Sequence, residues 1–398
     1  VVDHPAVALL EEALKALGDQ DSAARAAVLG RLAGELYFTD ESSRRLALAD
    51  EAVAVARRLG RDDTLARALR DRHIAGWGPG NPTERLAIAD ELVAAATRCG
   101  RRNLELLGRT FRLIASLQLG DGATADAELD ASEAIARDLR APLLLGHVGW
   151  GRSMKALLAG RFAEAEALIH ENLRATQRFD PAEALRTWSG QMVQLYEQQG
   201  RMALLESTVR SYIDIDPVHL VWRTVLALLL AEDGRIDQAQ AQFDVVAAAD
   251  FTDTPRDIAW LFALAARAEV CTLLGDRRRA ALLYDLLAPY DHQVIVLFTR
   301  PLCAGAVAHY LGSLAVVLGR HDEGEAHLRR AVELHEGLGA RPFLARSRYR
   351  LADLLLRRGH AEDRAEVAAL LDSSATTAAD LGMAGLARRV DELQNRTV

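Results

Sequence analysis

The sequence predicts an all-α protein made of stacked helical hairpins, and three observations support this. Helix-favouring residues, above all Ala, Leu, Arg and Glu, dominate nearly every segment. A small residue and then a large residue follow a set of recurring glycines at fixed distances. These glycines stand 40, 40, 34, 41, 44 and 40 residues apart, at Gly120, Gly160, Gly200, Gly234, Gly275, Gly319 and Gly359. A period near 40 residues is typical of one hairpin per unit, which buries its core only against neighbouring units.

The residues after each glycine predict the second helix of each hairpin. Five positions on stand small or apolar residues, namely Ala125, Ala165, Leu205, Ala239, Ala280 and Gly324. Nine positions on stand larger residues, namely Leu129, Ile169, Val209, Phe243, Tyr284 and Leu328. Offsets of five and nine place both residues on one helix face, which we expect to pack inward. The glycine is expected to end the first helix in a left-handed conformation.

The array extends toward both ends of the chain. Segment 45–51 is echoed by segment 85–91, and hairpin turns are expected near Asp40 and Gly80. Counting the turns from Asp40 to Gly359 predicts nine hairpins and one further helix at each end. We therefore expect one helical-repeat domain over residues 1–398. A second set of glycines is expected to end the second helices, at Gly60, Gly100, Gly339 and Gly382.

This order of glycine, small residue and large residue resembles the tetratricopeptide repeat (TPR), most clearly in segments 234–239 and 275–280. The standard TPR unit has 34 residues, a length that only the step from Gly200 to Gly234 keeps. The resemblance implies a TPR-like α-solenoid that forms a right-handed superhelix. It also implies a concave groove lined by the first helix of each hairpin.

Composition narrows the class of protein. The formal net charge is −8, with acidic residues interleaved with arginine as on solvated helix faces, which gives little support to nucleic-acid binding. Three scattered cysteines are too few for a disulfide framework. No apolar run approaches the roughly 20 residues that span a bilayer. We expect a cytoplasmic protein without membrane contact, and the abrupt start at Val1 without an initiator Met leads us to expect a piece of a longer polypeptide.

The sequence contains no motif for catalysis or cofactor binding. A phosphate-binding loop, a dinucleotide fingerprint, His-Glu-x-x-His and a nucleophile elbow are all missing. The glycine-rich segment 76–80 has no following lysine and is interpreted as a turn. Glu323 and His327 stand four residues apart, but a structural zinc site takes four ligands, so an ion pair is the preferred interpretation. We expect no metal and no cofactor.

The concave wall is the best place for a binding site. In the TPR register the wall positions lie thirteen, ten and six residues before each recurring glycine, where polar and aromatic residues are interspersed as in a pocket for a mixed ligand. Trp77, in a turn, is a further candidate for stacking, whereas Trp188 and Trp222 are expected in the core. The candidates for contact with a ligand or partner are His147, Trp150, Gln194, Thr224, Glu269, His309, Arg346 and Tyr349.

Segment 289–301 breaks the rhythm of the repeats. Its β-branched residues stand between Pro289 and Pro301 and disfavour a regular helix. The preferred interpretation is a long connection that buries residues 294–298 in the core. A gating or partner-docking loop is the alternative.

Several stretches resemble the C-terminal helical region of large actinobacterial signalling ATPases, which include LuxR-type transcriptional regulators and cyclase-linked relatives. The segments that carry the resemblance are 255–257, 260–261, 271–276, 284–290, 309–312, 318–320 and 338–342. Segment 294–300 departs from it, because it lacks the glycine-containing turn expected in relatives. The resemblance implies a sensor arm of a multidomain switch, without the ATPase or the DNA-binding domain.

Three functions are weighed on this basis. The leading hypothesis is a non-catalytic sensor and protein-interaction module of a cytoplasmic signalling or transcriptional regulator, which binds a small effector or a partner in its groove. The alternative is a scaffold that grips a peptide or another domain of its parent protein without a small ligand. The third is an enzyme in which His147, Glu269 or His309 act as acid and base across the groove.

Overall fold

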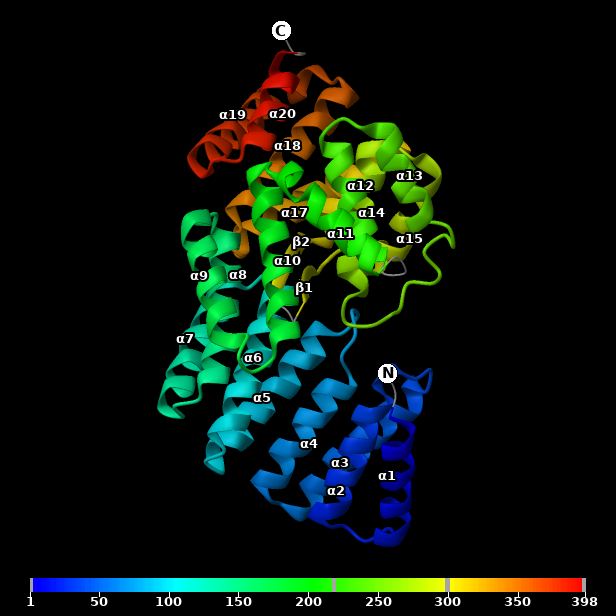
Figure 1. Ribbon diagram of the computed structural model, residues 1–398, viewed down its shortest axis with the longest axis vertical. Coiled ribbons are helices and arrows are strands. Elements are labelled where there is room, and N and C mark those ends of the chain that lie inside the picture. The colour runs from blue at the N-terminus through cyan, green and yellow to red at the C-terminus, as the bar shows by residue number, and fades with distance from the viewer. Residues whose placement is uncertain (1–2, 217–219, 298–300, 396–398) are drawn as a thin grey trace. The chain divides into compact units, whose positions relative to one another are not determined.

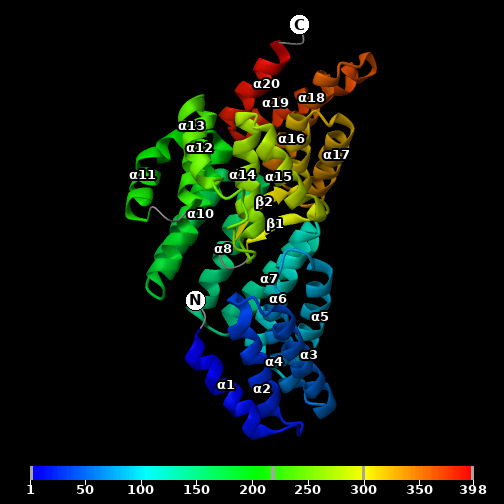
Figure 2. The same cartoon turned by 90° about the vertical axis from the view of Figure 1, so that its right-hand side faces the viewer.

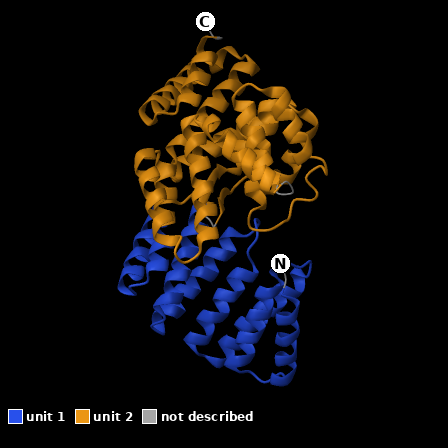
Figure 3. Cartoon of the chain, viewed as in Figure 1, with its two compact units in different colours: residues 1–117, 123–148 blue, residues 118–122, 149–398 orange. Residues whose placement is uncertain are grey.

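The computed structural model describes residues 3–216, 220–297 and 301–395, and this part of the chain is all-α apart from one β-hairpin. The chain divides into two compact units (Figure 3). Unit 1 comprises residues 1–117 and 123–148, and unit 2 comprises residues 118–122 and 149–398. Within the described ranges, every helix is too short or too polar to span a bilayer.

Unit 1 consists of helices packed in sequence order (Figure 1). Its helices are α1 (His4–Leu17), α2 (Ala23–Glu35), α3 (Ser42–Leu59), α4 (Asp62–Ala75), α5 (Pro82–Arg98), α6 (Arg102–Gln118), α7 (Gly122–Asp138) and the first part of α8 (Pro142–Ala159), with a 3-10 turn η1 (Leu36–Phe38). Helix α2 packs on α3 and also on α4. The glycine-rich segment 76–80 is the turn between α4 and α5, as predicted.

Unit 2 contains the remaining helices and two short strands (Figures 1 and 2). The helices are α9 (Phe162–Thr176), α10 (Pro181–Gln199), α11 (Glu206–Ile215), α12 (Leu220–Glu232), α13 (Ile236–Val246), α14 (Trp260–Leu274), α15 (Arg277–Leu287), α16 (Val307–Leu318), α17 (His321–Gly337), α18 (Arg341–Arg358), α19 (Arg364–Leu381) and α20 (Ala384–Asn395). The strands are β1 (Val294–Leu297) and β2 (Leu302–Ala306), and the 3-10 turns are η2 (Met202–Leu205), η3 (Ala288–Tyr290) and η4 (Ala361–Asp363).

The predicted division into hairpins is confirmed. The described helices α2 to α19 pair around the nine expected turns, and α1 and α20 are the single helices at the two ends. All seven recurring glycines have φ between +69° and +82°, and the four glycines that end second helices have φ between +65° and +69°. This left-handed conformation closes a helix with little strain only for glycine, which explains why glycine marks the repeat.

The inward face of the second helices is also confirmed. Ala125, Ala165, Ala239 and Ala280 have no exposed surface, and the six larger residues four positions later are all buried. The small side chains allow close helix contact while the larger ones fill the core. Leu205 is the exception: it ends the 3-10 turn η2 and is only partly buried, and α11 begins one residue after it.

Unit 2 stacks the first helices of successive hairpins against each other. Helix α12 contacts α14, α14 contacts α16, and α16 contacts α18. Each of these helices also packs on the second helix of its own hairpin, and α15 packs on α16 as well. Helix α20 then packs on α10, α18 and α19. This arrangement is the one expected of a helical-repeat solenoid.

Segment 289–301 contains strand β1, and β2 begins at the next residue; together they form the one strand pair of the described residues. Strands β1 and β2 are antiparallel, and every residue of both is buried. The predicted burial of residues 294–297 is therefore confirmed, although Phe298 lies outside the described residues. The β-hairpin itself was not predicted. Its pairing is irregular after Ile295, where β2 carries the extra residue Ala304.

Side chains from three helices hold the backbone of this hairpin. On α10, Gln191 donates to the carbonyl of Pro301 at 2.7 Å and Gln194 donates to that of Cys303 at 2.8 Å. The hydroxyl of Tyr310 donates to Ala304 O at 2.6 Å. The backbone N–H of Ala306 donates to Nε2 of His335 at 2.8 Å. Because the hairpin has only two strands, these bonds satisfy backbone groups that a larger sheet would pair.

Replacing Gln194 by leucine tests this role. The carbonyl of Cys303 would lose its donor in a buried position, so we expect a loss of about 1–2 kcal/mol in the free energy of unfolding. Urea unfolding followed by circular dichroism measures it. The exposed Gln177 on the preceding turn is the matched control, and Q177L should stay within about 0.5 kcal/mol of wild type. Equal stability of the two variants would contradict the role assigned to Gln194.

Candidate functional site

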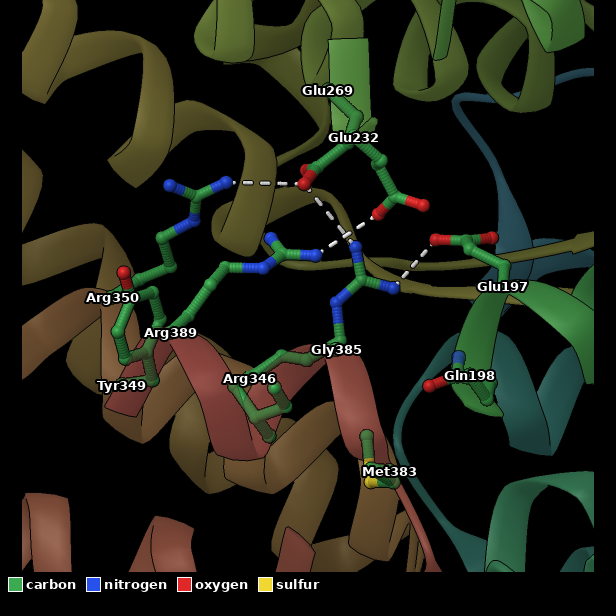
Figure 4. A pocket seen from close by; sticks show the side chains of 11 residues that line it. Glu197, Gln198, Glu232, Glu269, Arg346, Tyr349, Arg350, Met383, Gly385 and Arg389 are labelled. Carbon is green, nitrogen blue, oxygen red and sulfur yellow. Dashed lines mark hydrogen bonds and ion pairs between the residues drawn. The ribbon is translucent and has the colours of Figure 1, made fainter. Parts of the chain in front are cut away.

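Unit 2 contains a pocket whose lining is rich in charge (Figure 4). It collects side chains from helices α10, α12, α14, α18 and α20, which are far apart in the sequence. About 380 Å³ of space free of protein atoms lies at this pocket, open solvent at its mouth included. The lining residues are Glu197, Gln198, Glu232, Glu269, Arg346, Tyr349, Arg350, Met383, Gly385, Leu386 and Arg389.

Three glutamates reach the pocket from three first helices. Glu197 lies in the last turn of α10, Glu232 is the last residue of α12, and Glu269 lies in the second half of α14. Stacking of α12 on α14 brings the ends of these helices together. The negative charges therefore come from equivalent parts of successive repeats.

Three arginines face these glutamates from the C-terminal helices. Arg346 and Arg350 stand four residues apart on α18, so their side chains lie on one helix face together with Tyr349. Arg389 lies one turn after Gly385 on α20. The pocket thus has three potential negative charges and three positive ones.

The charged side chains form a connected network (Figure 4). Arg346 donates to Glu197 Oε1 at 2.6 Å, and its other terminal nitrogen lies 3.3 Å from Glu269 Oε1. Arg350 donates to the same Glu269 oxygen at 3.1 Å. Arg389 donates to Glu232 Oε1 at 3.0 Å. Arg346 therefore connects the glutamates of α10 and α14.

Glu269 is the most deeply buried member of the network. Its side chain is 4% exposed, against 12% for Arg346 and 16% for Arg350. Burial alone would raise the pKa of Glu269, but the positive charges of Arg350 and Arg346 outweigh it and hold the pKa below its usual value. Glu269 is therefore a buried carboxylate at neutral pH.

The pKa of Glu232 shifts in the opposite direction. Burial raises it above the usual value, and the charge of Arg389 only partly opposes this effect. Glu232 consequently takes up a proton more readily than Glu269 as the pH falls. The pKa of Arg346 is raised, since Glu197 and Glu269 outweigh the effect of its burial, so this side chain remains charged.

One oxygen of Glu269 has no hydrogen-bond partner among the described residues. Both arginines bind Oε1, whereas Oε2 is buried and without a donor. A buried carboxylate oxygen without a donor is costly. Oε2 is therefore an unsatisfied acceptor among the described residues.

A pair of buried histidines lies next to this network. Ser347, adjacent to Arg346 on α18, contacts Nδ1 of His309 at 2.8 Å and Nδ1 of His335 at 3.1 Å. Nε2 of His335 accepts the N–H of Ala306, so its Nδ1 carries the proton and donates to Ser347. The serine hydroxyl is then left to donate to Nδ1 of His309. Both rings are neutral, because burial lowers the pKa of His335 to about 3 and that of His309 well below 6.5.

Because these histidines are buried in the neutral form, we expect the folded chain to lose stability in mild acid. The pKa of His335 is lower in the folded chain than its usual 6.5, so its contribution is complete above pH 6.5 and is lost as the pH falls toward 3. Between pH 7 and pH 5.5 we expect this residue to account for a loss of about 1 kcal/mol. Urea unfolding of wild type and H335Q at both pH values measures it. Parallel pH dependence of the two proteins would contradict the prediction.

Three of the predicted groove residues are brought together. Glu269, Arg346 and Tyr349 all line the pocket. His309 lies beside it and is close enough for its pKa to respond to Glu269. Gln194 is instead used by the chain itself, since it holds the carbonyl of Cys303.

The structure places the other three predicted groove residues elsewhere. Thr224 is buried and donates to the carbonyl of Leu220 in its own helix at 3.0 Å. Trp150 is 3% exposed within a hydrophobic core, so its ring does not face an open groove. His147 is exposed in the part of α8 that belongs to unit 1.

The tryptophans differ from their predicted roles. Trp77, a candidate for stacking on a ligand, is buried, with only 8% of its surface exposed. Trp188 and Trp222, expected in the core, are only partly buried against it. The ring of Trp222 stacks on Tyr212 at 4.6 Å. The register placed Trp188 and Trp222 on the first helices of their hairpins, α10 and α12, but it missed which side of each helix faces the core.

Sequence reasoning missed Glu197, Glu232, Arg350 and Arg389. A local signal was present for the first two: both stand at helix C-termini, where the helix dipole disfavours negative charge unless a cation compensates it. A second signal was the spacing of Arg346 and Arg350, because like charges four residues apart destabilise a helix unless they share an acid. Arg389 had no such signal.

The part of the chain that the structure describes contains no cluster of side chains suited to a metal ion. No three His, Cys, Asp or Glu side chains gather there in a way that could hold a metal ion. Glu323 and His327 are bridged by the hydroxyl of Tyr284, which lies 2.9 Å from the carboxylate and 3.0 Å from Nε2. Their proximity is therefore explained by hydrogen bonding.

Fold and site together define an all-α helical-repeat protein with a charged pocket among its repeats. No protein-family model matches the sequence, and no curated protein matches it. Solved structures do match, among them the structure of Naa15/Naa10 bound to HypK-THB, with 15% identity over 93% of this chain and a TM-score of 0.23. The chain spans 60% of that solved chain. The fold class follows from the helices themselves, and this similarity adds nothing on function.

Proposed function

We propose that this chain is a non-catalytic interaction module of a regulatory protein and binds a small effector in the charged pocket of unit 2. Helical-repeat solenoids are a general type of interaction scaffold. The observation that carries the small-effector part is Glu269, a buried carboxylate in the pocket wall with one oxygen for which the described residues supply no donor. The resemblance to the helical region of signalling ATPases, on the segments given above, supports a sensor role.

The way the pocket is lined supports a sensor role. Its lining comes from α10, α12 and α14 on one side and from α18 and α20 on the other. A ligand that binds between these two groups would change the ion pairs that join them. Binding would thus alter how firmly the C-terminal helices are held, which is a change that a neighbouring domain of a longer protein could detect.

A peptide scaffold is the second candidate. Gln191 and Gln194 on α10 bind backbone carbonyls, as a receptor for an extended peptide would. Those carbonyls belong to Pro301, just before the chain's own β2, and to Cys303 within it, so this face is already occupied. The small-effector proposal therefore ranks first.

Catalysis is the third and weakest candidate. Glu269 is engaged by two arginines, and Nδ1 of His309 is bound to Ser347. The lowered pKa of His309 makes it a poor general acid near neutral pH. These contacts favour a binding role.

Native mass spectrometry after incubation with a small-molecule extract of the source cells tests the proposal. We expect a small adduct on wild type that is lost in E269Q, because the amide removes the charge that balances Arg346 and Arg350. E171Q, at an exposed position of α9, is the matched control and should keep the adduct. A protein-sized adduct from whole lysate, with no small one, would favour the scaffold. An adduct that survives in folded E269Q would place the site elsewhere.

A further inference from the structure

We infer that the pocket takes a small zwitterion, a molecule with one ammonium and one carboxylate group such as a free α-amino acid. This inference rests on the proposed function and names the class of its ligand. It follows from three properties of the lining: the charge balance, the acceptor at Glu269 and the donors at the arginines.

The charge balance of the pocket restricts its ligand. Three glutamates face three arginines, so the network is neutral when all six groups are ionised. An anion or a cation would add an unbalanced charge to a largely buried site, which is strongly disfavoured. A zwitterion adds no net charge.

Glu269 provides the acceptor for the ammonium group. Its Oε2 is buried and has no donor in the described part of the chain, while Oε1 is occupied by Arg346 and Arg350. An ammonium group has three donors and no acceptor, so it matches this oxygen. It would be held by the one carboxylate that the arginines keep ionised.

The arginines provide the donors for the carboxylate group. The contact found for Arg389 among the described residues is to one oxygen of Glu232, and that found for Arg350 is to one oxygen of Glu269. A guanidinium group carries five N–H donors in a fixed geometry that suits a carboxylate. Side-chain exposures of 26% and 16% leave both groups accessible from the pocket.

Isothermal titration calorimetry of the full chain tests the inference with three sets of probes. These are the free α-amino acids, their N-acetyl derivatives and their methyl esters. Acetylation removes the ammonium charge and esterification removes the carboxylate, while the side chain stays the same. We expect at least one amino acid to bind with a Kd at least tenfold lower than that of either derivative. Equal affinities, or no binding of any amino acid to the folded chain, would overturn the inference.

Two variants assign each charge to its partner. E269Q should weaken the amino acid at least tenfold and leave its N-acetyl derivative unchanged, since that derivative has no ammonium group. R389Q should weaken the amino acid and leave its methyl ester unchanged, whereas R388Q, at the exposed neighbouring position, should alter neither. If E269Q does not fold, the neutral pair E232Q/R389Q replaces it, because it keeps the net charge, and it should weaken the amino acid but not the ester. Retained affinity there would overturn the inference.

The two proposals fail in distinguishable ways. If the cell extract produces an adduct that depends on Glu269 but no amino acid binds, the ligand class is wrong and the effector site stands. If amino acids bind and E269Q binds them equally well, the ligand does not use this pocket. If neither the extract nor the amino acids bind to folded wild type, both proposals fall.

Discussion

Replacing Glu269 by alanine is expected to lower the free energy of unfolding by about 3–5 kcal/mol. Glu269 is the shared partner of Arg346 and Arg350, which are themselves largely buried. Without it, Arg350 loses the carboxylate that it binds, and Arg346 keeps, among the described residues, only its pair with Glu197. Breaking a buried ion pair on one side is costly because the remaining charge keeps its desolvation penalty. Urea unfolding followed by circular dichroism measures the change in unit 2.

The control for this prediction is alanine at an exposed glutamate. E171A, on the surface of α9, should change the unfolding free energy by no more than about 0.5 kcal/mol. Ionic strength provides a second test, since buried pairs are screened much less than exposed ones. A loss for E269A below about 1 kcal/mol would mean that water reaches the cluster and that Glu269 is not a buried charge.

Replacing Gly305 by alanine is expected to cost about 2–4 kcal/mol, because two penalties combine. Gly305 has φ of +77°, a conformation that a side chain disfavours. A Cβ atom there would lie 2.7 Å from Cδ1 of Phe343 and 2.9 Å from Nε2 of His335. The substitution would also disturb the bond between His335 and Ala306. The loss is again read from the urea unfolding curve.

Gly339 isolates the conformational part of this effect. It has φ of +65°, and a Cβ atom there would meet no atom of the described residues within 4 Å. G339A should therefore lose only about 1–2 kcal/mol, from backbone strain alone. The excess loss in G305A measures the packing around the β-hairpin. Equal losses in the two variants would show that this packing tolerates an added methyl group.

The G305A variant also tests a connection between the β-hairpin and the proposed site. His335 connects the β-hairpin to Ser347, and Ser347 lies next to Arg346 on α18. The hairpin, the buried histidines and the charged pocket are thus joined by consecutive contacts within unit 2. We expect G305A to weaken effector binding only if it displaces α18.

The groove predicted from the repeat register is partly filled by the chain itself. Gly190, a predicted wall position, is packed so closely that a Cβ atom would lie 2.9 Å from Cδ1 of Leu302 in β2. The polar residue Gln194, one turn later, serves the carbonyl of Cys303. Polar wall residues there satisfy a buried strand, which the register alone could not distinguish from a ligand site.

The sequence by itself determined the helices and the turns of this protein. A glycine at the turn and a small residue five positions later meet local requirements of a helical hairpin, so they recur in most repeats and can be counted. The nine hairpins between single end helices, and the burial of the second-helix faces, are confirmed for this reason. The right-handed superhelix, the parent regulator and the ligand stay predictions.

Tertiary structure alone decided the β-hairpin and the charged network. Arg346 meets Glu197 across 149 residues, and Arg389 meets Glu232 across 157. No local pattern encodes such pairs, because a glutamate at the end of α12 looks like a solvated residue until α20 packs beside it. Likewise, Val294 to Leu297 become a strand only because β2 and the glutamines of α10 supply hydrogen bonds for their buried hairpin. Local chemistry sets the repeat, whereas long-range packing sets which charges are buried together.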